Sequence, residues 1–146
     1  MIHITGDNKF NDFERLKSKE DKKYLVKKWI GKEYGAILFK VDFVICRAGI
    51  NTLIESAYME KLALVIPIPY IYQDEQNKNA KFFEKFDSIQ ILPQSKLTSE
   101  TLIENVKLMI KNLSKSKKDI GTTKSVVIKD AAKRLALEII LLGKGK

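Results

Sequence analysis

The sequence contains a single histidine, His3, and a single cysteine, Cys46, among 146 residues. A protein metal site needs three or four ligands, so we expect neither a metal centre nor a metal cofactor. One cysteine cannot form an internal disulfide, and the first ten residues lack the basic and then apolar pattern of a secretory signal. We therefore expect a cytoplasmic protein.

Long apolar runs are also missing. The longest covers residues 62–72 and contains two prolines, whereas a membrane-spanning helix needs roughly 20 apolar residues. Arginine is scarce, so the net charge of +9 is carried almost entirely by lysine. Because nucleic-acid-binding surfaces tend to combine arginine with aromatic residues, we expect no nucleic-acid partner. A loose, peripheral association of the lysines with an anionic membrane surface stays open.

Apolar residues make up 45% of the chain and charged residues 31%, as in ordinary globular proteins. Short runs rich in β-branched residues alternate with helical stretches, which is typical of a parallel α/β sheet. The pattern predicts strands over residues 2–5, 24–29, 42–46, 62–66 and 89–92.

Four helices are expected between and after these strands. They cover residues 52–61, 74–86, 99–113 and about 126–142, with a polar connection over 114–125. The first should begin just after Gly49 with a capping box, in which the Thr52 hydroxyl and the Glu55 carboxylate each accept a backbone N–H. No repeat or linker is visible, so a single domain over residues 1–146 is expected.

The segment DFVICRAGINTLIE, residues 42–55, joins an apolar strand to a helix through a glycine turn. A helix N-terminus carries partial positive charge and free N–H groups, and Gly49 would let the backbone approach a phosphate. The amides of Ile50, Asn51 and Thr52 are therefore candidate pyrophosphate donors. Many α/β proteins have the same geometry and no ligand there, so the pattern alone leaves both interpretations open.

Within this segment the run R-A-G-x-x-T-x-x-E resembles the signature of the glycosyltransferase family 28 C-terminal domain. After the strand LALVIPIPY, the segment QDEQNKNA resembles the family's Gln-x-x-Asn-Ala motif at residues 76–80. In the same order, HITG at 3–6, Trp29-Ile30 and KDAAKRLA at 129–136 resemble further family features. The resemblance covers most of the chain and implies the Rossmann-like parallel α/β sheet of a GT-B C-terminal domain.

The resemblance implies a site for UDP-N-acetylglucosamine. Ile30 would contact the uracil edge through its backbone, and Glu55 would accept hydrogen bonds from both ribose hydroxyls, or else serve only the capping box. Gln76 and Asn79 would bond the hydroxyls of the sugar. Arg47 would either neutralise the pyrophosphate or orient the turn by bonding backbone carbonyls. The expected donor-binding residues are Ile30, Arg47, Gly49, Ile50, Asn51, Thr52, Glu55, Gln76 and Asn79.

No catalytic residue is expected in this chain, because the resemblance places the family's catalytic base in another domain. His3 is then structural or supports a neighbour. Cys46 ends an apolar strand beside no obvious base, so we expect a buried, inert thiol.

The implied function is that of the donor-binding half of an enzyme that moves N-acetylglucosamine to a lipid-linked peptidoglycan precursor. It would act at the inner face of the cell membrane. Alternatives are a related glycolipid or split dolichol-type glycosyltransferase subunit, and a noncatalytic binding or partner subunit.

Two departures from the family pattern accompany this expectation. Ile4 stands where the family has glutamine in its His-Gln-x-Gly run. The family's domain begins earlier, with a strand and a Gly-Gly-Ser-type loop. We expect this chain to lack that first strand and the whole N-terminal domain, to be a fragment or to need a partner chain, and to be inactive alone.

Overall fold

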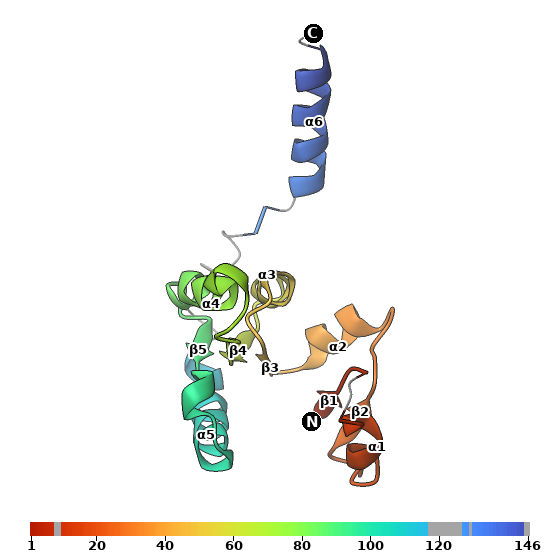
Figure 1. Cartoon of the computed structure of the whole chain (residues 1–146), viewed down its shortest axis with the longest axis vertical. Helices are drawn as coiled ribbons and strands as arrows, with labels where there is room; N and C mark the ends of the chain where they lie inside the picture. The colour runs from red at the N-terminus through yellow and green to blue at the C-terminus, as the bar shows by residue number, and fades with distance from the viewer. Residues whose placement is uncertain (8–9, 117–126, 129, 145–146) are drawn as a thin grey trace. The chain divides into compact units, whose positions relative to one another are not determined.

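The computed structural model describes residues 1–7, 10–116, 127–128 and 130–144. The chain divides into two compact units (Figure 1): Met1–Lys40, the N-terminal unit, and Val41–Lys146, the C-terminal unit. Each unit is described by itself.

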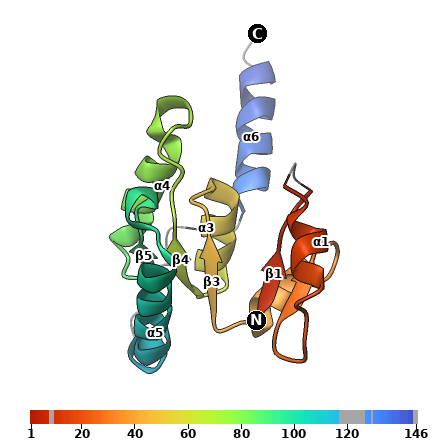
Figure 2. The same cartoon turned by 60° about the horizontal axis from the view of Figure 1, so that its bottom comes forward.

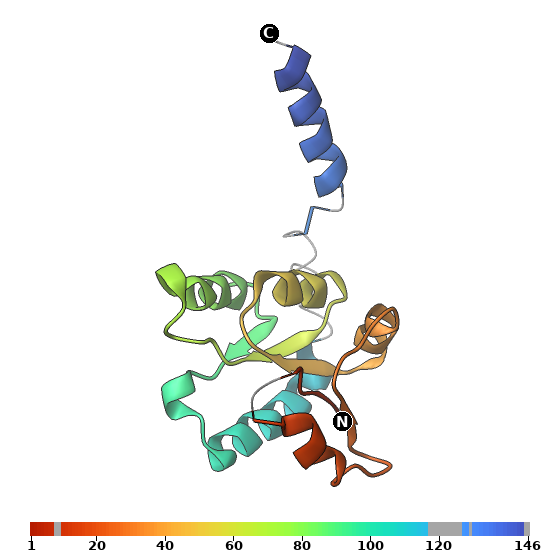
Figure 3. The same ribbon diagram turned by 45° about the vertical axis from the view of Figure 1, so that its right-hand side comes forward.

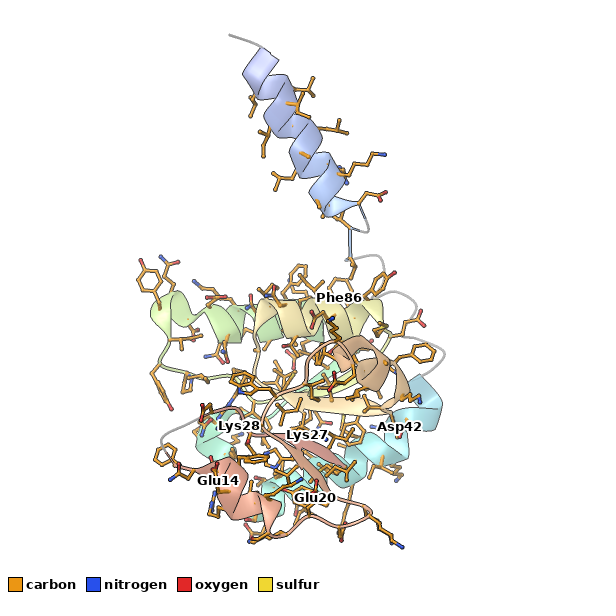
Figure 4. The ribbon with its side chains drawn as sticks, turned by 90° about the vertical axis from the view of Figure 1, so that its right-hand side faces the viewer. Glu14, Glu20, Lys27, Lys28, Asp42 and Phe86 are labelled. Atoms are coloured by element: carbon orange, nitrogen blue, oxygen red, sulfur yellow. The ribbon has the colours of Figure 1, made fainter. Side chains whose placement is uncertain are left out.

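The N-terminal unit is a two-stranded parallel sheet with two short helices. Its elements are β1 (Ile2–Ile4), α1 (Asp12–Lys17), β2 (Leu25–Lys27) and α2 (Tyr34–Lys40). Val26 at the centre of β2 is fully buried, and Glu20, labelled in Figure 4, accepts its N–H at 3.0 Å. A hydrogen bond from Lys17 lowers the pKa of Glu20, and the Val26 N–H adds to the effect. A charged side chain thus holds the centre of β2.

The C-terminal unit has a parallel sheet in the order β3-β4-β5. Helices α3 and α4 cover one face of this sheet, and α5 covers the other (Figure 3). The elements are β3 (Phe43–Cys46), α3 (Ile50–Tyr58), β4 (Leu62–Val65), η1 (Tyr72–Asp74), α4 (Glu75–Glu84), β5 (Ile89–Ile91), η2 (Gln94–Lys96), α5 (Ser99–Ser116) and α6 (Ala131–Lys144).

Strand β4 lies at the centre of the core, because all four of its residues are buried. Ala63 and Val65 pack with the buried side chains of α3 and α4. Leu62 and Leu64 point to the opposite face and pack with Met109 of α5. Successive side chains of a strand alternate between the two faces of a sheet, so a run without polar residues needs a helical layer on each side.

The α/β fold with a parallel sheet is confirmed, and all five predicted strands form within two residues of the expected bounds. Helices form in the four predicted regions, while the short helices α1 and α2 were not predicted. Helix α5 continues to Ser116, so the predicted polar connection began too early. The rest of that connection, over 117–125, lies outside the described residues, as does the predicted start of the last helix at 126.

The predicted capping box is wrong. Helix α3 begins at Ile50 with Gly49 as its N-cap, and no side chain caps it. The first intrahelical bond runs from the Leu53 N–H to the Gly49 carbonyl at 3.1 Å. Thr52 therefore lies inside the first turn, where its own N–H is one of the terminal donors. The expectation that the helix starts just after Gly49 is confirmed.

Helix α6 is exposed along residues 131–143, including its leucines and isoleucines. Among the described helices, none combines the length and the apolar character needed to cross a membrane.

Replacement of Phe83 by alanine tests the core. Phe83 is 1% exposed, whereas its neighbour Phe82 on α4 is 47% exposed. We expect Phe83→Ala to lower the free energy of unfolding by ~3–5 kcal/mol. Phe82→Ala should lower it by roughly half of that or less, because nearly half of Phe82 is already exposed and it loses mainly its edge contacts with Phe83 and Phe86. Urea denaturation of both variants measures the difference. Equal losses would mean that α4 does not pack on the sheet as described.

Candidate functional site

The candidate site lies at the carboxyl ends of β3, β4 and β5, which run side by side (Figure 2). Three connections begin there: residues 47–49 before α3, residues 66–74 (which include η1) before α4, and residues 92–93 before η2. In open α/β sheets, ligands bind outside the carboxyl ends of the strands. Most of the residues singled out from the sequence lie on these connections or on the helices that follow them.

The N-terminus of α3 presents three backbone donors. The amides of Ile50, Asn51 and Thr52 precede the first intrahelical bond, so they have no acceptor within their own helix. Gly49 has an extended backbone that any residue can adopt, and a Cβ built on it would meet no atom within 4 Å. Neither backbone conformation nor internal packing requires glycine there. The open space beside Gly49 is suited to the close approach of an anionic ligand.

Arg47 connects the ends of β4 and β5. Its Nη1 donates to the Ile66 carbonyl at 3.0 Å and also to Oε1 of Gln94. Of the two roles left open for Arg47, the orienting role therefore has a contact that supports it. Nε and Nη2 of Arg47 make no hydrogen bond within the described residues, so three charged N–H donors stay available for a phosphate. The predicted contact with the pyrophosphate stays a prediction.

Gln76 and Asn79 of α4 both contact the turn before α3. Oε1 of Gln76 accepts the N–H of Ala48 at 3.3 Å and the N–H of Ile68 at 3.0 Å. Nδ2 of Asn79 donates to the Ala48 carbonyl at 3.1 Å. The structure therefore brings both amides to the turn that precedes α3, and their predicted contacts with a sugar stay predictions.

Glu55 lies in α3 and is exposed. Its carboxylate has no hydrogen-bond partner within the described part of the chain, so it can accept bonds from a ligand. Ile30 belongs to the N-terminal unit. It lies in the connection from β2 to α2 and is half-buried. The predicted contact between Ile30 and uracil stays a prediction.

Gln94 was missed by the sequence interpretation although it holds Arg47. A signal was present, because Gln94 follows the strand β5 closely, and neighbouring parallel strands end at the same edge of a sheet. Arg47 directly after β3 and Gln94 three residues after β5 are polar side chains at one edge of the sheet, which indicates a contact between them.

His3 and Cys46 were both expected to have structural rather than catalytic roles. Nδ1 of His3 and the Tyr24 hydroxyl are hydrogen-bonded at 2.8 Å. Burial raises the pKa of the Cys46 thiol to about 11, so the thiol is protonated and a poor nucleophile at neutral pH. The interpretation of Cys46 as an inert thiol is in keeping with this environment.

The reactivity of Cys46 with a thiol reagent should show this shift. A pKa raised from 9.0 to about 11 lowers the thiolate fraction about 100-fold below pH 9. We expect the folded chain at pH 8 to react about 100-fold more slowly than the urea-unfolded chain, and its rate to keep rising up to about pH 11. Rapid modification of the folded chain with a plateau near pH 9 would contradict this burial.

Comparison with known proteins adds to this geometry. Residues 1–135 match the glycosyltransferase family 28 C-terminal domain. The UDP-N-acetylglucosamine--N-acetylmuramyl-(pentapeptide) pyrophosphoryl-undecaprenol N-acetylglucosamine transferase of Bacillus cytotoxicus is 31% identical over 138 residues, which cover 92% of this chain and 37% of that protein. The Streptococcus uberis protein of the same name is 28% identical over 148 residues, covering 100% of this chain and 39% of its own length.

A solved structure shows the same fold. The crystal structure of MurG from Acinetobacter baumannii superposes with a TM-score of 0.70 at 23% identity, over 92% of this chain and 39% of that protein. The chain thus spans well under half the length of the relatives that it matches.

Proposed function

Because the chain belongs to the glycosyltransferase family 28 C-terminal domain family, we propose that it is the donor-binding part of a hexosyltransferase that moves N-acetylglucosamine from UDP-N-acetylglucosamine. The named activity of the relatives supports the donor and the reaction. The strongest structural support is the start of α3, where three amides without an acceptor in their own helix, the uncrowded Gly49 and the exposed Glu55 occur together.

The pyrophosphate is proposed to bind at the α3 N-terminus. As the sugar leaves, negative charge develops on the UDP, and donors already aimed at that charge lower the barrier. The amides of Ile50, Asn51 and Thr52 would supply the partial positive charge of the helix end. The unpaired N–H groups of Arg47 would add a full charge from a guanidinium already fixed by Ile66 and Gln94.

The ribose and the sugar are proposed to bind on either side of the pyrophosphate. Glu55 would accept from the two ribose hydroxyls, since a carboxylate only accepts hydrogen bonds. Each N-acetylglucosamine hydroxyl can both donate and accept. Nε2 of Gln76 and Oδ1 of Asn79 are the polar atoms of these two side chains that make no bond within the described residues, and they would serve as a donor and an acceptor for the sugar. Ile30 would contact the uracil.

The acceptor is proposed to be the lipid-linked, undecaprenol-type molecule in the relatives' name. The general base would come from the part of the longer relatives that this chain does not span. We therefore propose that these 146 residues bind the donor without transferring it. The proposed site of action is the cytoplasmic face of the membrane, where the lysine-rich surface would favour anionic lipid.

Titration calorimetry with UDP-N-acetylglucosamine tests the donor site. Two charge-assisted hydrogen bonds contribute about 1.5–3 kcal/mol each, so Glu55→Ala should weaken binding at least about tenfold. Glu104→Ala, an exposed glutamate on α5, is the matched control and should bind like wild type. If the wild-type chain bound no UDP-N-acetylglucosamine, or if both variants bound it equally well, the proposed donor site would be wrong.

A further inference from the structure

We infer that Gln76 and Asn79 are positioning residues, which hold the backbone that leads into α3. This inference rests on the proposed function for its consequence, because the backbone held in this way carries the proposed pyrophosphate donors. The contacts themselves are features of the folded chain and do not depend on a ligand.

Both backbone groups of Ala48 are bonded to side chains of one helix. Its N–H is accepted by Gln76 and its carbonyl accepts from Asn79. The two side chains are three positions apart on α4, so they lie on the same face of that helix. Ala48 is fully buried, and water is not available to replace either partner. A buried backbone group that loses its hydrogen-bond partner destabilises the fold, so these two bonds restrict the conformation of the turn.

The two bonds orient successive peptide planes. The Ala48 N–H belongs to the plane that joins Arg47 to Ala48, and the Ala48 carbonyl belongs to the plane that enters Gly49. With both planes held, the direction in which the chain enters α3 is determined. The helix-end amides are then aimed before any ligand arrives, and a preorganised donor needs no rearrangement as charge develops.

Gln76 also joins two connections of the sheet. The same Oε1 that accepts from Ala48 also accepts from Ile68, on the segment after β4. Arg47 makes a parallel link from the turn after β3 to Ile66 and Gln94. Side chains therefore tie together the carboxyl ends of all three strands, and Gln76 acts on the α3 amides through the turn rather than through a ligand.

The chemistry of the partners determines which amide atom is used. Both partners of Gln76 are N–H donors, so the atom facing them is oxygen, and the partner of Asn79 is a carbonyl, so the atom facing it is nitrogen. A carboxylate at position 76 would keep the required acceptor, lose the NH2 group and add a negative charge. A carboxylate at position 79 would place an oxygen against the Ala48 carbonyl. Positioning thus predicts that the turn keeps its bonds in Gln76→Glu and loses one in Asn79→Asp. The sugar contact proposed for the Gln76 NH2 group uses the other atom of the same side chain and is lost in Gln76→Glu.

Amide hydrogen exchange of the 15N-labelled 146-residue chain, measured without ligand, tests the contacts. We expect Gln76→Glu to keep exchange at Ala48 and Ile68 within about threefold of wild type. Asn79→Asp should accelerate exchange at Ala48 at least about tenfold, because a carboxylate against the Ala48 carbonyl displaces the turn and with it the bond from the Ala48 N–H to Gln76. Gln76→Leu should accelerate exchange at both Ala48 and Ile68, because both amides lose their acceptor. Asn77→Asp is the control, because it alters a side-chain bond of α4 to Asp74 that touches no strand end. Unchanged exchange at Ala48 in Asn79→Asp and Gln76→Leu would overturn the inference.

The affinity for UDP-N-acetylglucosamine, measured on the same variants, tests the consequence. Asn79→Asp keeps an acceptor oxygen for the sugar but loses the bond to Ala48, so it should bind at least about tenfold more weakly than wild type. Asn77→Asp, which adds the same charge to α4, should bind within about threefold of wild type. An Asn79→Asp chain with accelerated exchange at Ala48 but wild-type affinity would contradict the claim that these contacts position the donor site. If the exchange results held and the wild-type chain bound no donor, the proposed function would fail while the positioning contacts stood. Should Gln76→Leu fail to fold, Gln76→Glu and Asn79→Asp still decide the matter.

Discussion

The burial of β4 on both faces is the constraint on which the rest of the C-terminal unit depends. Four consecutive apolar residues cannot face water on either side, so one helical layer must cover each face. Helices α3 and α4 lie on one side, and α5 on the other. Strands β3 and β5 pair with β4 in parallel, so all three carboxyl ends meet at one edge. The site lies there because the core requires this alignment.

Polar contacts hold the connections together at that edge, where the apolar core ends. The side chains of Arg47, Gln76, Asn79 and Gln94 bond backbone groups or one another across the three connections. Several of the backbone groups are buried, and their bonds are strong constraints because no water competes for them. These bonds hold the backbone that leads into α3. The amides of Ile50, Asn51 and Thr52 at the start of that helix have no acceptor within it. Hydrophobic packing thus sets where the site lies, and directional hydrogen bonds set its shape.

The strands could be predicted from short apolar runs, and most helices from apolar residues that recur on one helical face, because both patterns reflect burial. Helices α1 and α2 could not, since their six and seven residues are too few for a clear 3.6-residue pattern. The prediction of a capping box failed because a Thr-x-x-Glu pattern can also lie inside a helix that has already begun. The structure shows that α3 begins at Ile50 with Gly49 as its N-cap. The bonds from Gln76 and Asn79 to Ala48 join residues 28 and 31 positions apart. Sequence could indicate that these side chains reach one edge, but not which atoms they bond.

The most direct test of this account is an NMR titration of the 15N-labelled chain with UDP and, separately, with uridine. If the diphosphate binds the α3 N-terminus, UDP should shift the amide signals of Ile50, Asn51 and Thr52 more than those of α5, and uridine should leave these three nearly unchanged. Equal shifts with uridine, or UDP shifts confined to other parts of the chain, would contradict the claim that this helix end is the anion site.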